Sequence, residues 1–151
     1  MQAEERAVWE RVQSTGTLTA ENALLPERLT ALIEGEKKTA AECTQLACRL
    51  SGSAGMATRR IRAQAEGRAR HLAALHFLLT GKRTYIKPPQ IPFHKNLCEA
   101  LREHCLSMLA LQEQYAKVAA EFPAHAKAMD RLSLSLRNDL RTATSILERF
   151  M

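Results

Sequence analysis

The longest uninterrupted helical pattern in this sequence is PERLTALIEGEKKTAAECTQLACRL, residues 26–50. Its apolar residues recur every three or four positions, as on a helix with one buried face. They are Leu29, Leu32, Ile33, Ala40, Cys43, Ala47 and Leu50. Glu36 falls on the same face, where an unpaired carboxylate would be costly or would take up a proton. We therefore expect Glu36 to meet a partner inside the fold.

Three further helical patterns follow, over residues 56–80, 94–121 and 124–150, and each has its own inward line. Gly81 is a natural stop for the first of them, and Pro123 separates the other two. The line in residues 56–80 consists of Ile61, Ala65, Arg68, Leu72, Leu75 and Leu79. The line in residues 94–121 consists of Leu97, Leu101, His104, Met108, Leu111, Tyr115, Val118 and Phe122. The line in residues 124–150 consists of Met129, Leu132, Leu136, Asp139, Ala143, Ile146 and Phe150.

Residues 82–93, KRTYIKPPQIPF, contain three prolines and cannot form a helix. In extended form, at about 3.3 Å per residue, this segment is long enough to cross from one end of a bundle toward the other. The links between the first and second helices, and between the third and fourth, are short. The sequence therefore predicts an all-α four-helix bundle with one long crossover between helices 2 and 3.

The 151 residues predict a single domain, 1–151, with the ordinary globular balance of 46% hydrophobic and 25% charged residues. Residues 26–151 form the predicted bundle. Residues 1–25 form an N-terminal arm and connector, with a short N-terminal helix over residues 3–13. We expect Trp9 to anchor this arm on the bundle.

The sequence favours a cytoplasmic protein that does not enter a membrane. No apolar run approaches the roughly 18 residues of a membrane span, and the first residues, MQAEERAVWE, are charged where a signal peptide would be apolar. The four cysteines lie inside helical patterns without a CxxC pair, which favours reduced thiols over a disulfide or zinc framework. They are Cys43, Cys48, Cys98 and Cys105.

Three stretches resemble rubrerythrin-type proteins of the ferritin-like superfamily. ALIEGEKKTAAECTQLACRL, residues 31–50, resembles their first core helix, in which a Leu-Ile pair precedes the metal-binding glutamate. RHLAALHFLLTG, residues 70–81, resembles the end of their second helix, and VWERV, residues 8–12, resembles the N-terminal arm of bacterial relatives. The resemblance covers most of the chain and implies a ferritin-like bundle.

This family has a di-iron site, built from one glutamate on each of two helices and a Glu-x-x-His pair on each of the other two. The resemblance places the six ligand positions at Glu36, Ala65, Arg68, Met108, Leu136 and Asp139. Glu36 matches the family ligand, and Asp139 places a carboxylate where the Glu-x-x-His pair of the fourth helix has its histidine. Ala65, Met108 and Leu136 are positions of lost ligands. The resemblance thus implies a degenerate di-iron site.

Arg68 lies on the inward line of its helix, where a charge is unexpected. A di-iron centre needs several anionic oxygens and two imidazoles, and this core offers too few. We predict that the Arg68 guanidinium replaces the metal charge and is held by Glu36 and Asp139 in a buried charge cluster. This hypothesis favours a structural or interaction role without metal, cofactor or catalysis.

The alternative is a divergent metalloprotein for peroxide reduction or iron handling, with iron or zinc at a relocated site. Its ligands would be Glu36, His71, His104 and Asp139. The simpler interpretation is that His71 and His104 are partly buried or surface polar residues. We find no Ser-His-Asp or Cys-His arrangement, phosphate loop or HExxH motif, so the sequence does not favour a conventional hydrolase or nucleotide-binding protein.

Two surface features suggest partners. Arg59, Arg62 and Arg70 could form a basic face for nucleic acid, consistent with a net charge of +6. Aromatic residues make up only 5% and none is interleaved with these arginines for base stacking, so a solvated face is the better interpretation. An apolar patch on the third helix could instead pair two copies in a homodimer or bind an unknown protein partner. It consists of Leu106, Leu109, Cys98 and Cys105.

Overall fold

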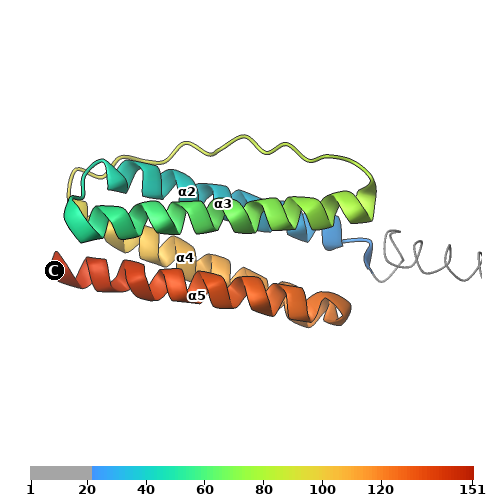
Figure 1. The fold of residues 1–151 in the computed structure, drawn as a ribbon. Coiled ribbons are helices and arrows are strands. Elements are labelled where there is room, and N and C mark those ends of the chain that lie inside the picture. Colours follow the sequence, from blue (N-terminus) through green and yellow to red (C-terminus); the bar gives the residue numbers. More distant parts are fainter. Residues whose placement is uncertain (1–21) are drawn as a thin grey trace, which may run out of the picture.

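The computed structural model describes residues 22–151, which fold into four long helices without any strand (Figure 1). The helices are α2 (Leu25–Ala47), α3 (Gly52–Thr80), α4 (Leu97–Glu121) and α5 (Ala126–Arg149). A single 3-10 turn, η2 (Pro123–His125), joins α4 to α5. The prediction of an all-α four-helix bundle is confirmed. The short N-terminal helix and the Trp9 anchor lie outside the described residues.

The four helices pack as two hairpins, α2 with α3 and α4 with α5, and α2 also contacts α4 while α3 contacts α5. Residues 81–96, which we call the crossover, run along the outside of the bundle from one end to the other (Figure 1). The crossover returns the chain to the end where α3 began, so α3 and α4 run in the same direction and the contacting pairs are antiparallel. The prediction of one long crossover is confirmed.

Local sequence explains most helix ends. Pro26 lies in the first turn of α2, where its missing N–H costs no hydrogen bond. The Asn96 side chain caps α4 by accepting from the Glu99 N–H at 3.0 Å. Gly81 ends α3 with φ at 70°, and its N–H donates to the Phe77 carbonyl at 2.7 Å.

Two predicted helix ends are wrong by several residues. The first helix ends at Ala47 instead of residue 50, and α3 begins at Gly52 instead of residue 56. The glycines in SGSAG suggested a loop over residues 51–55. In the structure Gly52, at φ 61°, opens the helix, and Ala54 and Gly55 are buried in its first turns. Tertiary packing here outweighs the weak helix propensity of glycine.

Three side chains hold the crossover against the bundle: Lys37 and Gln45 on α2, and Arg49 just after its end. Lys37 Nζ donates to a crossover carbonyl at 2.7 Å, Gln45 Nε2 to another at 3.1 Å, and the two Nη atoms of Arg49 to two more at 2.8 Å each. The accepting carbonyls are those of Ile86, Ile91, His94 and Lys95. Because the proline-rich crossover has no helical hydrogen bonds, these contacts fix its path over α2.

The predicted inward lines form the core. Most of their residues are buried, including the four polar side chains of Glu36, Arg68, His104 and Asp139. Phe150 is an exception, because α5 ends at Arg149 and the Phe150 side chain is 43% exposed. Ala47, Leu75 and Leu97 are only partly buried. Among residues 22–151, no helix is both long enough and apolar enough to cross a membrane.

The start of α3 tolerates no side chain at Gly55. A Cβ there would lie 2.7 Å from the Leu50 carbonyl oxygen, which belongs to the backbone and cannot move aside easily. We expect Gly55→Ala to lower the free energy of unfolding by about 1–3 kcal/mol through overpacking. A Cβ at Gly67, on the same helix, meets nothing nearer than the Arg70 guanidinium at 3.8 Å. Gly67→Ala should therefore stabilise the protein by up to about 1 kcal/mol. Urea unfolding of both variants measures the difference, and equal effects would contradict this account.

Candidate functional site

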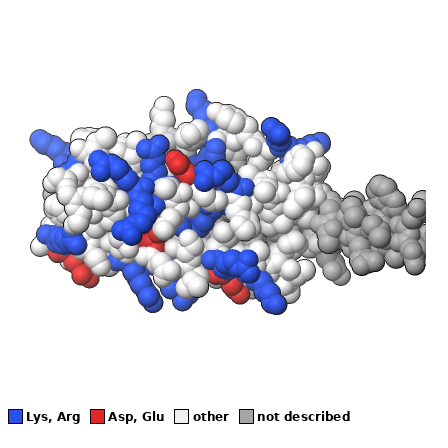
Figure 2. Space-filling view, in the orientation of Figure 1, with Lys and Arg blue, Asp and Glu red and all other residues white. Residues whose placement is uncertain are grey.

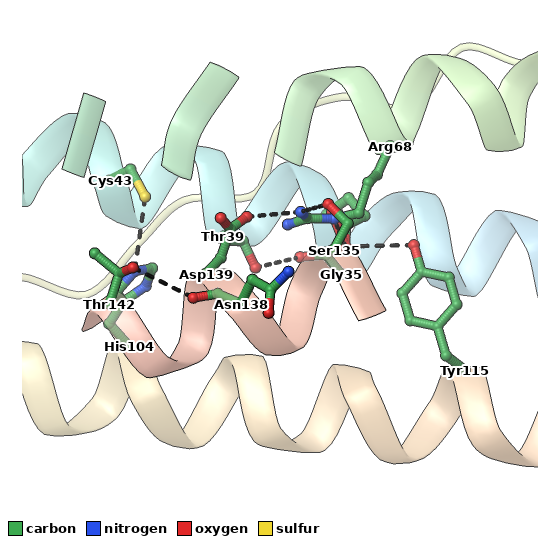
Figure 3. Close-up of polar contacts among 11 residues, drawn as sticks. Gly35, Thr39, Cys43, Arg68, His104, Tyr115, Ser135, Asn138, Asp139 and Thr142 are labelled. Atoms are coloured by element: carbon green, nitrogen blue, oxygen red, sulfur yellow. Dashed lines mark hydrogen bonds and ion pairs between the residues drawn. The ribbon is translucent and has the colours of Figure 1, made fainter. Parts of the chain in front are cut away.

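The Arg68 side chain leaves α3 and points into the bundle between α2 and α5 (Figure 3). Its Nε donates to both carboxylate oxygens of Glu36 on α2, at 2.8 and 3.0 Å. Its Nη1 lies 2.6 Å from Asp139 Oδ2 on α5. The three side chains are only 3%, 0% and 5% exposed. The structure thus brings Glu36, Arg68 and Asp139 together, and we call them the Arg68 cluster.

Neighbouring polar groups provide hydrogen bonds for most of the polar atoms of the Arg68 cluster. The Tyr115 hydroxyl on α4 donates to Glu36 Oε1 at 3.3 Å, and the guanidinium Nη1 also donates to Ser135 Oγ at 3.0 Å. The Gln64 amide, with its nitrogen turned toward Asp139, donates to that carboxylate as well. The guanidinium Nη2 is buried without a hydrogen-bond partner among the described residues. All four helices therefore contribute to one buried polar network.

The Arg68 cluster contains one cation and two carboxylates. Burial raises the pKa of Glu36 to about 7, although the attraction of Arg68 opposes this shift. Burial also raises the pKa of Asp139 against the attraction of Arg68. For Arg68 itself burial disfavours the charge, but the pull of the two carboxylates is larger and the pKa is raised. The guanidinium stays charged, and Glu36 changes its protonation near neutral pH.

A second buried polar chain joins α2 to α4. His104 Nδ1 lies 3.0 Å from Glu42 Oε1, and His104 Nε2 lies 3.6 Å from Cys43 Sγ (Figure 3). Ser107 Oγ donates to the other Glu42 oxygen at 3.1 Å. The sequence predicted no Cys-His arrangement, but the packed helices bring Cys43 and His104 into contact. Cys43 and His104 are 61 positions apart in the chain, so only the packing of α2 on α4 reveals their contact.

The order Cys43, His104, Glu42 matches that of nucleophile, base and orienting carboxylate in cysteine hydrolases. The Cys43 side chain is 0% exposed, so no substrate reaches its sulfur. Burial also raises the pKa of the Cys43 thiol well above its usual range, which keeps it protonated. The arrangement is therefore a hydrogen-bonded contact between helices and does not form an active nucleophile.

The alternative metal ligands do not assemble. His71 is exposed on α3, whereas Glu36, His104 and Asp139 are buried. The three buried residues do not form one group. His104 contacts Glu42, whereas Glu36 and Asp139 are paired with Arg68. Within residues 22–151 no three His, Cys, Asp or Glu side chains are grouped so that they could hold a metal ion. The relocated iron or zinc site is not found in this part of the chain.

The surface features lie where the sequence placed them. Arg59, Arg62 and Arg70 are exposed on α3, and Figure 2 shows many basic and few acidic side chains on the face that carries this helix. On α4, Leu106 and Leu109 are about half exposed. Whether this patch pairs two copies stays a prediction.

No family model, curated protein or solved structure matches this chain. The resemblance to ferritin-like proteins therefore rests on the residues themselves. The described residues form a four-helix bundle with one long crossover and with buried ion pairs of Arg68.

Removing the cation should be costly, because two carboxylates would remain buried without it. We expect Arg68→Met to lower the free energy of unfolding by about 3–5 kcal/mol. Replacing the carboxylates as well, in Glu36→Gln/Arg68→Met/Asp139→Asn, should recover much of this loss. Arg70→Met, at an exposed position of the same helix, should change stability by less than about 0.5 kcal/mol. Denaturant unfolding at pH 7 gives these values, and a harmless Arg68→Met would contradict the buried cluster.

Stability should also depend on the Glu36 proton. Because the folded-state pKa lies above the ordinary 4.5, the folded protein holds a proton that the unfolded chain releases between about pH 4.5 and 7. The free energy of unfolding should therefore fall as pH rises through this window, by about 3 kcal/mol from Glu36 alone.

We expect Glu36→Gln to remove this part of the decline. Glu34→Gln, on the exposed side of α2, should keep the wild-type slope. Urea unfolding at several pH values between 4.5 and 8 compares the three proteins. Parallel profiles for wild type and Glu36→Gln would show that Glu36 does not take up the proton.

Proposed function

We propose that this chain is a degenerate ferritin-like protein, in which the Arg68 guanidinium stands in the place of the metal ions. The observation that carries the proposal is the buried contact of Arg68 with Glu36 and Asp139. Two antiparallel hairpins joined by one long crossover are also the arrangement that ferritin-like bundles use. On this view the protein has a structural or interaction role and is not an enzyme.

The residues at the six proposed ligand positions do not fit a di-iron centre. Ala65, Met108 and Leu136 are fully buried and bring no oxygen or nitrogen ligand. Only Glu36 and Asp139 carry carboxylates, and no imidazole is among the six. Two iron ions need more anionic oxygens than two carboxylates supply. A single guanidinium needs fewer, and the distances to both carboxylates are those of strong ion pairs.

If the bundle has no metal chemistry, its outer surface is the part that could have a function. Its core is fully used by packing and ion pairs, so any partner must bind the outer surface. The half-exposed Leu106 and Leu109 on α4 support pairing of two copies or binding of another protein. We place this activity in the cytoplasm, in keeping with the reduced state of the four cysteines.

Metal content tests the proposal directly. We expect wild-type protein, expressed with iron and zinc supplied, to contain substoichiometric amounts of both by plasma mass spectrometry. Tightly held stoichiometric metal would contradict the proposal and favour a metalloprotein.

Restoring the ligands tests the positions. We expect a five-residue variant to bind two iron ions per chain and to melt at a higher temperature with iron than without it. Its substitutions are Ala65→Glu, Arg68→His, Met108→Glu, Leu136→Glu and Asp139→His. A matched variant with the three new glutamates that retains Arg68 and Asp139 should bind no iron, because the guanidinium still occupies the centre. Two results would show that these are not former ligand positions. One is that the five-residue variant binds no iron, and the other is that the matched variant, which retains Arg68 and Asp139, binds iron.

A further inference from the structure

A groove of about 590 Å³ lies between α2, α3 and the crossover, and we call it the crossover groove. Small-molecule sites usually measure about 300–1,000 Å³ and are mostly apolar, so its size suits a ligand and not only water. Alanines on both helices leave the space that larger side chains would fill. Its apolar lining includes Ile33, Ala40, Ala41, Ala69, Ala73 and Ile86.

The polar lining of the crossover groove has excess positive charge. Arg62, Arg70, Lys37 and Glu66 all contribute to it. Arg62 is balanced, because its Nε lies 3.1 Å from Glu66 Oε1. Lys37 donates to the Ile86 carbonyl of the crossover. Among the described residues, neither Lys37 nor Arg70 has a carboxylate partner. The charges of Lys37 and Arg70 are therefore not balanced by a carboxylate of the described residues, although Lys37 also contacts the Ile86 carbonyl and the Tyr85 ring.

The two unbalanced cations lie close to each other along the groove. Glu36 on α2 is bonded to Arg68 on α3, and the two helices are antiparallel, so this pair fixes their register. Counting outward from it places Lys37 and Arg70 within about one helical turn. The α2 lining then continues from Lys37 to Gln45, a rise of about 12 Å past Ala40 and Ala41. The same count places the paired Arg62 and Glu66 of α3 beside this stretch, so its apolar lining comes from the alanines of α2 and from the crossover.

We propose that the crossover groove binds a medium-chain fatty acid, with the carboxylate at Arg70 and Lys37 and the alkyl chain along the alanine floor. A guanidinium pairs well with a carboxylate, and burial of methylene groups supplies the remaining attraction. A nucleotide fits less well, because no aromatic side chain lines the groove to stack on a base. A neutral apolar ligand would leave both cations without a partner.

The buried cluster gives the groove a rigid wall. Glu36 lines the groove although its side chain is inaccessible to solvent, so the Arg68 cluster lies directly behind this surface. The opposite wall depends on the crossover, which Lys37 and Gln45 hold through its carbonyls. The groove is therefore formed before any ligand arrives, which reduces the ordering cost of binding.

Calorimetric titration of the full chain with decanoate, below its micelle concentration, tests the proposal. We expect saturable binding of one decanoate per chain. Arg70→Gln should weaken it at least tenfold, whereas Arg59→Gln, on the same helix but outside the groove, should leave it unchanged. Decanol, which has the same tail without the charge, should bind at least tenfold more weakly than decanoate.

A second variant separates the tail from the headgroup. Ala41→Leu puts a larger side chain on the half-buried groove wall and leaves both cations in place, so it should abolish decanoate binding while melting shows a folded protein. No binding to wild type, equal binding of decanol, or equal affinity of Ala41→Leu would overturn the proposal. These outcomes do not bear on the degenerate metal site, which is decided by metal content and ligand restoration.

Discussion

The packing of this bundle depends on one cation in its interior. Arg68 on α3 is paired with Glu36 on α2 and with Asp139 on α5. Tyr115 on α4 donates to Glu36, so all four helices meet at this cation. Desolvation of the three charges cancels much of their attraction, so the cluster adds little net stability. Its effect is on register, because sliding α2 by one turn along α3 would leave buried charges without partners. Apolar contacts alone would tolerate such a shift more readily.

The parts of the fold that depend on helical period could be predicted from the sequence. Glu36, Arg68 and Asp139 were found because each interrupts an otherwise apolar line, and a buried charge needs a partner. Glu42 was missed because it lies beside the inward line of α2 and not on it. Its burial depends on how closely α4 packs against α2. Gly35 permits that approach, since a Cβ there would collide with Leu111. Sequence spacing does not contain this distance between helices.

The path of the crossover could not be predicted for a similar reason. Its prolines exclude a helix but are equally compatible with any face of the bundle. The choice is made by Lys37 and Gln45 on α2 and by Arg49 just after it, which donate to carbonyls of the crossover. Long polar side chains on a helix surface are ordinarily solvated, so nothing in the sequence marks these three as anchors. The crossover groove exists only because of that choice.

A buried guanidinium balances the charge of an interior differently from a metal ion. A metal centre must recruit a full set of ligands, and its fold then depends on an external ion. Arg68 is part of the chain, and its single charge leaves one carboxylate in excess. Glu36, with a pKa raised to about 7 by burial, can remove that excess by taking up one proton. The charge of the Arg68 cluster is therefore neutralised by the chain itself and by a proton from solvent.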